Sequence, residues 1–513
     1  MLSLAFLFAA CGVARLPAPL HARIDSLVAA GHPDYAKHAA PLAADAEFLR
    51  RATLDLNGTV PTTAEVREFL ADSDPKKRMR AIDRLLAAPA FARRMAWHFD
   101  VTLMERRRDA KVPRAAWEDF LRASFAANTP YDEFVRGILS ADGSDPKTRP
   151  AAKFLLDRDL EPNVVTRDLS RVFLGRNIQC AQCHDHPIID DYKQADYYGI
   201  LAFTNRSFLF PNATAPTAVI AEKGEGDATF VSVFDKDKKQ GTALPKVPGG
   251  KAVMEPKFEK GKEYKVPPAK DVKPVPAFSR REQLAANITT NPAFARTAAN
   301  RLWAMMHGRG LVNPIDLDHE GNPPSHPELL DLLAKELKEH RFDVKWFVRE
   351  IALSKSYQLS SETPAGIPEG QEDRYLAAQL KPLSPEQLAS AAAQATGGTD
   401  GALLPKFRAL FGAQPGQPED FAASLDQTLF LKFNPQVRTM LAPQKGNLAE
   451  RLTKLTEPGA FADELFVSVF SRPPTDDEKK DVAAALAAAK DRNAVVGDLI
   501  WALLASAEFR FNH

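Results

Sequence analysis

Residues 173–206 read FLGRNIQCAQCHDHPIIDDYKQADYYGILAFTNR, and this stretch holds two of the three cysteines of the chain. Within it, Cys180, Cys183 and His184 form a C-x-x-C-H motif. Two thiols at this spacing can form thioethers to a haem while the adjacent imidazole binds the iron. The motif therefore predicts haem c attached through Cys180 and Cys183, with His184 as the axial ligand.

Helical geometry agrees with the haem interpretation, because on an α-helix Cys180, Cys183 and His184 fall within one arc of about 100° and could face one porphyrin edge.

Three other interpretations of the motif stay open: a zinc site, a redox dithiol and a structural pair. Cys180, Cys183 and His186 lie on a neighbouring stripe and would make three ligands of a zinc site, although Pro187 disfavours helical geometry at His186. A redox dithiol would need a thioredoxin-like βαβ pattern, which is not found nearby. A purely structural interpretation makes the cysteines a reduced, buried pair with the histidines as hydrogen-bond partners.

The composition is that of a globular protein with several domains. With 513 residues, the chain is long enough for two to four domains and needs no disulfide framework. Apolar residues make up 45% and charged residues 26%, and the net charge is only +1. This balance argues against a nucleic-acid partner. Glycine-rich nucleotide motifs, G-x-S-x-G and H-E-x-x-H are not found, and His319-Glu320 is interpreted as structural.

The N-terminus begins MLSLAFLFAACGVARLPAP, with an apolar run over residues 2–10 followed by Cys11. This pattern predicts an export signal or lipoprotein leader in residues 1–20, with a lipid anchor at Cys11 as the only membrane contact. The alternative is a buried N-terminal helix, because the run is too short to span a bilayer. Export to the periplasm or cell envelope would agree with haem c, which is attached outside the cytoplasm.

The rest of the chain predicts a mainly α fold with two helical domains and a small β-rich insertion. Residues 21–206 show helical periodicity, with Thr62 or Thr63 as an N-cap and His98 on an aromatic helix. Residues 207–277 are rich in Pro and Lys and contain an alternating strand pattern at Thr229–Phe234. Residues 278–513 return to helical periodicity.

Several segments resemble a planctomycete family of exported two-domain proteins of unknown function, whose N-terminal domain is labelled cytochrome-C-like. The N-terminal segments are RATLDLNGTVPTTAEVREFLAD, AIDRLLAAPAFARRMAWHF, WEDFLRASFAANTPYDEFVRGIL and FLGRNIQCAQCHDHP. The C-terminal segments include NPAFARTAANRLWAMMHGRGLVNPIDLDHEGNPPSHPELL and DLIWALLASAEFRFNH. The resemblance covers most of the chain from His21 onward, except the middle region. It departs from many relatives at IIDDYKQA, which replaces a shorter, Trp-containing linker.

The resemblance implies further site residues. Cys180, Cys183, His184 and His186 match the CxxCHDHP signature of the family. His98 matches its helix histidine, and His326 matches its PPSHPELL segment. These two histidines are therefore the preferred candidates for a second iron ligand or an additional metal ligand, ahead of four methionines chosen by type alone: Met254, Met305, Met306 and Met440.

The function expected from this reading is electron transfer to or from a partner enzyme in the cell envelope, through a single covalent haem. The alternative is a metal-binding scaffold with zinc held by Cys180, Cys183, His186 and a distant histidine, or a hydrolase if Asp185, Asp190 or Asp191 completes an open site. A third possibility is a structural protein of the cell envelope that binds no metal.

Overall fold

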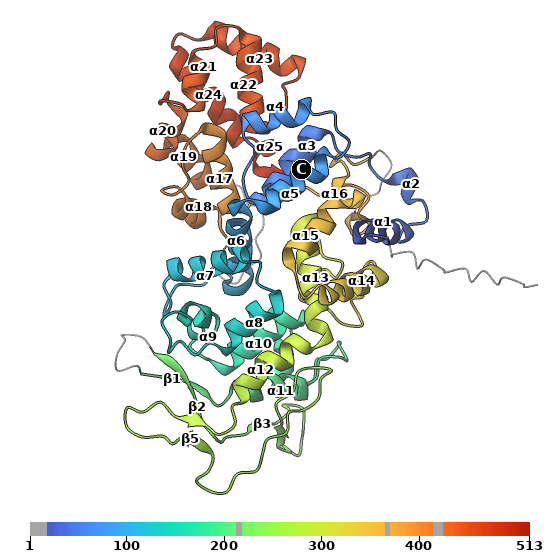
Figure 1. Ribbon diagram of the computed structural model, residues 1–513, viewed down its shortest axis with the longest axis vertical. Coiled ribbons are helices and arrows are strands. Elements are labelled where there is room, and N and C mark those ends of the chain that lie inside the picture. The colour runs from blue at the N-terminus through green and yellow to red at the C-terminus, as the bar shows by residue number, and fades with distance from the viewer. Residues whose placement is uncertain (1–17, 212–217, 365–369, 414–423) are drawn as a thin grey trace, which may run out of the picture.

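Helices account for most of the structure, a computed structural model that describes residues 18–211, 218–364, 370–413 and 424–513 (Figure 1). The first helices are α1 (Leu20–Ala30), α2 (Tyr35–His38), α3 (Asp45–Asn57), α4 (Thr63–Ala71), α5 (Lys77–Ala87), α6 (Pro89–Met104), α7 (Arg114–Ala126), α8 (Tyr131–Ser140), η1 (Arg149–Ala152), α9 (Lys153–Leu156), α10 (Pro162–Leu174), η2 (Gln179–Gln182) and α11 (Gln194–Thr204).

After the middle region come α12 (Arg280–Thr290), α13 (Pro292–His307), α14 (Pro327–Glu339), α15 (Val344–Leu353), α16 (Lys355–Gln358), η3 (Glu372–Arg374), α17 (Pro385–Thr396), α18 (Leu404–Phe411), α19 (Leu425–Phe433), α20 (Pro435–Leu441), α21 (Leu448–Thr453), α22 (Pro458–Phe470), α23 (Asp476–Ala488), α24 (Arg492–Ala505) and α25 (Ala507–Arg510). The predicted mainly α fold is confirmed. No helix in the described ranges is both long and apolar enough to cross a membrane. Cys11 and most of the predicted leader lie outside the described residues.

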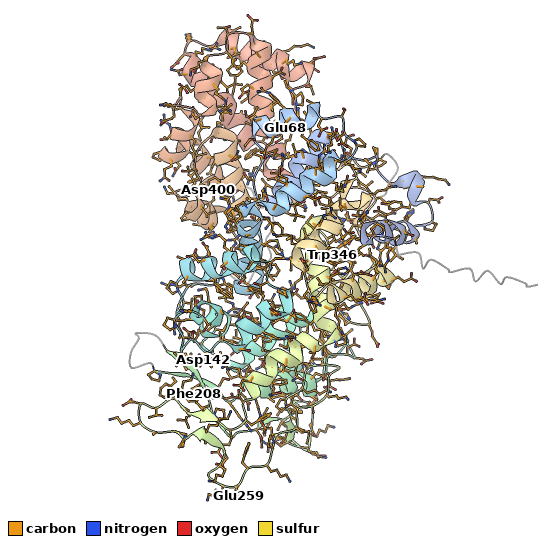
Figure 2. All side chains as sticks on the ribbon, in the orientation of Figure 1. Glu68, Asp142, Phe208, Glu259, Trp346 and Asp400 are labelled. Atoms are coloured by element: carbon orange, nitrogen blue, oxygen red, sulfur yellow. The ribbon has the colours of Figure 1, made fainter. Side chains whose placement is uncertain are left out.

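The strands form four small antiparallel pairs in the described part of the chain. They are β1 (Ser207–Phe210) with β2 (Val219–Glu222), β3 (Ala228–Phe230) with β4 (Gly241–Ala243), β5 (Tyr264–Val266) with β6 (Val275–Pro276), and β7 (Lys381–Pro382) with β8 (Phe511–Asn512). Six of these strands belong to the predicted β-rich insertion, which lies at one end of the molecule. Figure 2 shows Phe208 and Glu259 at this end.

Local sequence signals explain where several helices begin. At α4 the Thr62 hydroxyl accepts a hydrogen bond from the Glu65 amide (3.2 Å), and the Glu65 carboxylate accepts one from the Thr62 amide (2.9 Å). This reciprocal pair satisfies two amides that the helix itself cannot pair. Thr62, rather than Thr63, is therefore the N-cap among the two predicted candidates.

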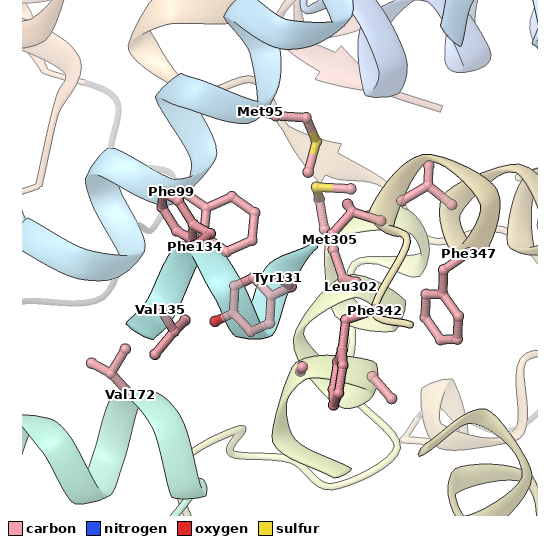
Figure 3. Packing of buried hydrophobic residues seen from close by; sticks show 14 of the residues in the cluster. Met95, Phe99, Tyr131, Phe134, Val135, Val172, Leu302, Met305, Phe342 and Phe347 are labelled. Carbon is pink, nitrogen blue, oxygen red and sulfur yellow. The ribbon is translucent and has the colours of Figure 1, made fainter. Parts of the chain in front are cut away.

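The larger hydrophobic core joins the helices on both sides of the insertion. Tyr131 at the start of α8 stacks on Phe294 of α13, with ring centroids 5.4 Å apart, and its amide donates to the Phe342 carbonyl (3.1 Å). Figure 3 shows Phe134 next to Phe99, and Tyr131 between this aromatic pair and Leu302 of α13. Because these aromatic side chains are buried together, the segments before and after the insertion pack as one body.

A second core fills the C-terminal helical group from α17 to α25. It also takes in Leu54 of α3 and Val60, which lie far away in sequence. The Gln387 side-chain amide donates to the Leu54 carbonyl (2.9 Å), so polar contacts accompany the apolar ones. Helix α3 therefore stands between the two cores.

Asp55 on α3 is a buried carboxylate that joins three distant segments. It accepts hydrogen bonds from the Tyr357 hydroxyl (2.9 Å), from Lys381 Nζ (2.6 Å) and from Asn512 Nδ2 (2.8 Å). Lys381 also donates to the Met306 carbonyl (2.6 Å). A buried charge is tolerated only when it is paired in this way, so these contacts fix β7, β8 and α16 against α3.

Replacing Asp55 with Asn is expected to lower the free energy of unfolding by about 3–5 kcal/mol, because it leaves the Lys381 ammonium buried without its counter-ion. The measurement is urea denaturation followed by tryptophan fluorescence. The matched control is Asp498→Asn, which removes an exposed ion pair with Lys432 (3.0 Å) and should cost less than about 1 kcal/mol. Equal losses in the two variants would contradict the role assigned to Asp55.

Candidate functional site

The C-x-x-C-H motif begins on a 3₁₀ turn rather than on the α-helix assumed from the sequence, with Cys180 inside the turn and Cys183 directly after it. The turn η2 covers residues 179–182, and the backbone leaves helical geometry after Cys183. In a 3₁₀ turn, residues three apart lie one above the other, so Cys180 and Cys183 occupy the same face. Both thiols are free and exposed. The alternative in which the two cysteines form a buried structural pair is therefore wrong. The two cysteines share a face because the 3₁₀ turn is wound more tightly than an α-helix.

Helix α11 holds the inner side of this turn. The Gln182 carbonyl accepts hydrogen bonds from the Tyr198 hydroxyl (3.2 Å) and the Gln194 side-chain amide (3.3 Å). The Asp185 carboxylate accepts from the Gln194 backbone amide at the start of α11 (2.8 Å). Ala181 is fully buried beneath the turn. The cysteines are consequently presented to the outside on a backbone that is fixed from within.

His184 and His186 have opposite hydrogen-bonding roles, although they are only two residues apart. Nδ1 of His184 lies 2.6 Å from the Asp185 carbonyl oxygen, which can only accept, so this nitrogen carries the proton and Nε2 keeps a lone pair. Nδ1 of His186 accepts from the amides of Ile188 (3.2 Å) and Ile189 (3.0 Å), so its proton is on Nε2. His184 is the histidine prepared to bind a metal ion through Nε2.

Exposed apolar side chains surround the motif. We define the apolar rim as Ile188, Val231, Val233 and Phe234, of which Ile188 is 86% and Phe234 72% exposed. The Phe234 ring lies 4.7 Å from the His184 ring, centroid to centroid. The Val233 amide donates to the Cys183 carbonyl (3.1 Å). The residues after Phe230 therefore bond to the motif instead of continuing the strand. For this reason the strand predicted at Thr229–Phe234 ends at Phe230.

His326, one of the two histidines implied by the family resemblance, is part of the packing around α1. It is only 5% exposed, and its ring faces Tyr375 at 5.6 Å between centroids. A Cβ atom on Gly31, directly after α1, would lie only 2.2 Å from His326 Nε2. The close approach of Gly31 gives His326 a structural role at the junction of α1 and α14.

His319 lies beside the motif loop, a proximity that its spacing in the sequence does not indicate. Its ring is 5.6 Å from that of Tyr192, which in turn lies 5.9 Å from the His186 ring. The Glu320 amide donates to the Asp191 carboxylate (3.1 Å). Even so, the described residues contain no group of three or more His, Cys, Asp or Glu side chains placed to hold a metal ion.

His98 lines a cavity of about 990 Å³, which is also lined by Asn177 and Gln179 of the segment preceding Cys180. Burial and the positive charges of Arg94 and Arg301 lower the pKa of His98 to about 3. Its imidazole is therefore neutral at physiological pH. His98 thus faces the interior cavity, whereas the two cysteines face the outer surface.

Many charged side chains line this cavity. The basic ones are Arg94, Arg106, Arg107, Arg167, Arg171, Arg301 and Lys381. The acidic ones are Asp55, Glu105, Asp168, Asp316 and Glu386. The wall therefore carries seven cationic groups against five carboxylates. No sequence motif marks these arginines. The one local signal is the spacing of Arg167 and Arg171, which lie four residues apart on one face of α10.

The end of α6 is held in an unusual backbone conformation at the cavity wall. Glu105 and Arg106 both adopt positive φ angles, 49° and 54°. Residues other than glycine rarely adopt a positive φ angle, and this backbone conformation persists only where surrounding contacts enforce it. Here ion pairs do so: Glu105 pairs with Arg171, and Arg106 pairs with Glu386 at 3.0 Å.

Comparison with known families divides the chain into two domains. Residues 23–208 match the family model PSCyt2, a protein of unknown function (DUF1549). Residues 280–420 match the family model PSD1, a protein of unknown function (DUF1553). No curated protein and no solved structure shows significant similarity to the chain. The chain thus has a two-domain architecture, and the cavity takes its walls from both matched segments, with Arg167 in the first and Arg301 in the second.

The ion pairs of Glu386 make a pH-dependent contribution to stability. Burial opposes its ionisation, but hydrogen bonds and charge from Arg106 and Arg408 outweigh burial and lower its pKa to about 2. A carboxylate with a lowered pKa stabilises the fold above the pKa of the unfolded chain, near 4.5, and loses this contribution as the pH falls towards 2.

We expect Glu386→Gln to be destabilised by about 3 kcal/mol at pH 7, with the difference from the unmodified protein shrinking as the pH falls from about 4.5 towards 2. Urea denaturation midpoints measured across this pH range provide the test. Glu68→Gln, on the exposed face of α4, is the control and should retain the pH profile of the unmodified protein. A constant difference at every pH would show that Glu386 does not titrate as described.

Proposed function

We propose that the chain is an exported, c-type cytochrome-like protein of the planctomycete family that it resembles, with one haem attached through Cys180 and Cys183 and bound by His184. The observation that carries the proposal is the contact between His184 Nδ1 and the Asp185 carbonyl at 2.6 Å. It fixes the tautomer that leaves Nε2 available, on the turn that presents two free thiols. A bound haem would supply a one-electron iron couple for exchange with a partner enzyme in the cell envelope.

The surroundings of the turn support this assignment. Covalent attachment needs two accessible thiols, and Cys180 and Cys183 are exposed on one face. A haem also has large apolar faces, and the apolar rim offers side chains that gain from covering them.

The zinc alternative receives less support from the same geometry. It requires Cys180, Cys183 and His186 to act together, with a further histidine. The backbone amides of Ile188 and Ile189 already use the Nδ1 lone pair of His186, which leaves a protonated Nε2. Zinc binding would therefore have to break this loop, whereas a bond from His184 Nε2 would leave its hydrogen bond to Asp185 intact.

The first test is expression of the full chain with a c-type cytochrome maturation system. We expect the denatured protein to gain the mass of one haem and to give a pyridine haemochrome spectrum, because thioether bonds survive denaturation. The double variant Cys180→Ala/Cys183→Ala should lose both signals. Protein that carries one zinc ion per chain and no haem would overturn the proposal in favour of the metal-binding scaffold or hydrolase.

Two histidine variants separate the proposed ligand from its neighbour. His184→Ala should lose the low-spin Soret spectrum, because the axial nitrogen is removed. His186→Asn should retain it, since the Asn side-chain oxygen can accept the same loop amides. Absorption spectra of the purified variants at equal haem content provide the measurement. An unchanged Soret band in His184→Ala, or its loss only in His186→Asn, would exclude His184 as the ligand.

A further inference from the structure

The cavity of about 990 Å³ lies apart from the cysteines and has no role in the proposed haem attachment. Its walls come from the end of α6, α10, α13 and the start of α17, and it falls in the size range of pockets for small molecules. Cys180, Cys183 and His184 are not among the residues that line it. What the cavity can bind is therefore decided by its own side chains.

Three arginines of the wall have hydrogen-bond donors to spare. Arg167 uses only Nε, which donates to Asp168 (2.9 Å), and neither of its Nη atoms has an acceptor among the described residues. Arg107 bonds Glu105 and Asp168 through Nη2, while its buried Nε has no acceptor within the described chain. Arg301 engages Nε and Nη2 but has no acceptor at Nη1 in the described ranges.

The neighbouring carboxylates position these arginines without neutralising the wall. Asp168 is held by Arg158 at 2.7 Å and by Arg107 at 2.9 Å, and Asp316 is held by Arg171 at 3.1 Å and Arg301 at 3.0 Å. Each pair orients a guanidinium before any ligand arrives, which reduces the entropy lost on binding. Because cations outnumber carboxylates in the wall, the cavity favours a negatively charged guest.

Part of the remaining wall is apolar and suits a carbon skeleton. Val101, Met305, Ile315 and Phe411 line the same space. Planar guanidinium groups bind carboxylate, sulfate and phosphate oxygens through paired hydrogen bonds. We propose that the cavity binds a small organic molecule that carries more than one oxyanion group, with Arg107, Arg167 and Arg301 as its principal contacts.

Calorimetric titration of the full chain with citrate tests the class of ligand. We expect saturable binding of one citrate per chain that weakens as sodium chloride is added, because the attraction is ionic. Trimethyl citrate, which has the same skeleton without the charges, should not bind. Inorganic phosphate and inorganic sulfate, titrated in parallel, distinguish the preferred oxyanion. Absence of saturable binding for all three anions at concentrations up to about 10 mM would overturn the proposal.

Arg167 offers the sharpest variant, because it is partly exposed and Asp168, its only partner among the described residues, keeps three other arginines, Arg107, Arg158 and Arg171. Arg167→Gln should weaken binding of the best anion about tenfold or more. The affinity of Arg167→Lys should lie between those of the unmodified protein and Arg167→Gln. The control is Arg122→Gln, which makes the same change in charge on the exposed face of α7, beside Asp119.

Equal weakening in Arg167→Gln and Arg122→Gln would show that only net charge matters and would overturn the assigned site. Circular dichroism and urea midpoints establish that each variant is folded, and Arg107→Gln provides a second variant should Arg167→Gln fail to fold. The heat of binding is measured without reference to the haem spectrum. Failure of the haem proposal and failure of the anion proposal are therefore separate results.

Discussion

The ion pair of Asp55 with Lys381 is the constraint on which the arrangement of the two cores depends. Ten consecutive residues of α3, Phe48 to Asn57, are buried, and three of them carry a charge. Arg50 donates to the Val469 and Phe509 carbonyls, and Arg51 donates to the Tyr357 and Leu359 carbonyls. Because a buried charge without a partner is costly, each partner segment must be in place for α3 to be stable. Residues 509–512 therefore pack against α3. Asp55 and Lys381 also line the cavity.

Backbone atoms distinguish the two histidines of the motif loop from each other. His184 and His186 are identical residues in one exposed loop, yet one faces a carbonyl oxygen and the other faces two amides. That difference assigns opposite tautomers and so separates a potential ligand from a loop-stabilising group. The inner hydrogen bonds from Tyr198 and Gln194 hold the turn in the conformation that makes this difference.

Features that depend on neighbours in sequence were predictable, and features that depend on distant contacts were not. The helices, the β-rich insertion and the cap at Thr62 follow from local periodicity and capping chemistry. The family resemblance selected His326, but its packing against Gly31 arises from a contact across almost 300 positions. The early end of the strand at Phe230 has the same cause, since its continuation bonds to Cys183. The cavity arginines come from both sides of the insertion, so no local pattern could have assembled them.

The cavity and the cysteine turn share one segment of backbone, which makes them mechanically connected. The Asp316 carboxylate accepts from Arg171 and Arg301 in the cavity wall, while the Asp316 carbonyl accepts from the Asn177 amide (2.8 Å) just before the turn. An anion that draws these arginines away from Asp316 would change the position of Asp316 and so affect its hydrogen bond with the Asn177 amide. Such coupling must be reciprocal: whatever a bound anion does to the equilibrium at the turn, a change at the turn does equally to the affinity for the anion. Asp316 is thus the residue through which any coupling between the two proposed sites would pass, since it contacts the cavity arginines with its carboxylate and Asn177 with its carbonyl.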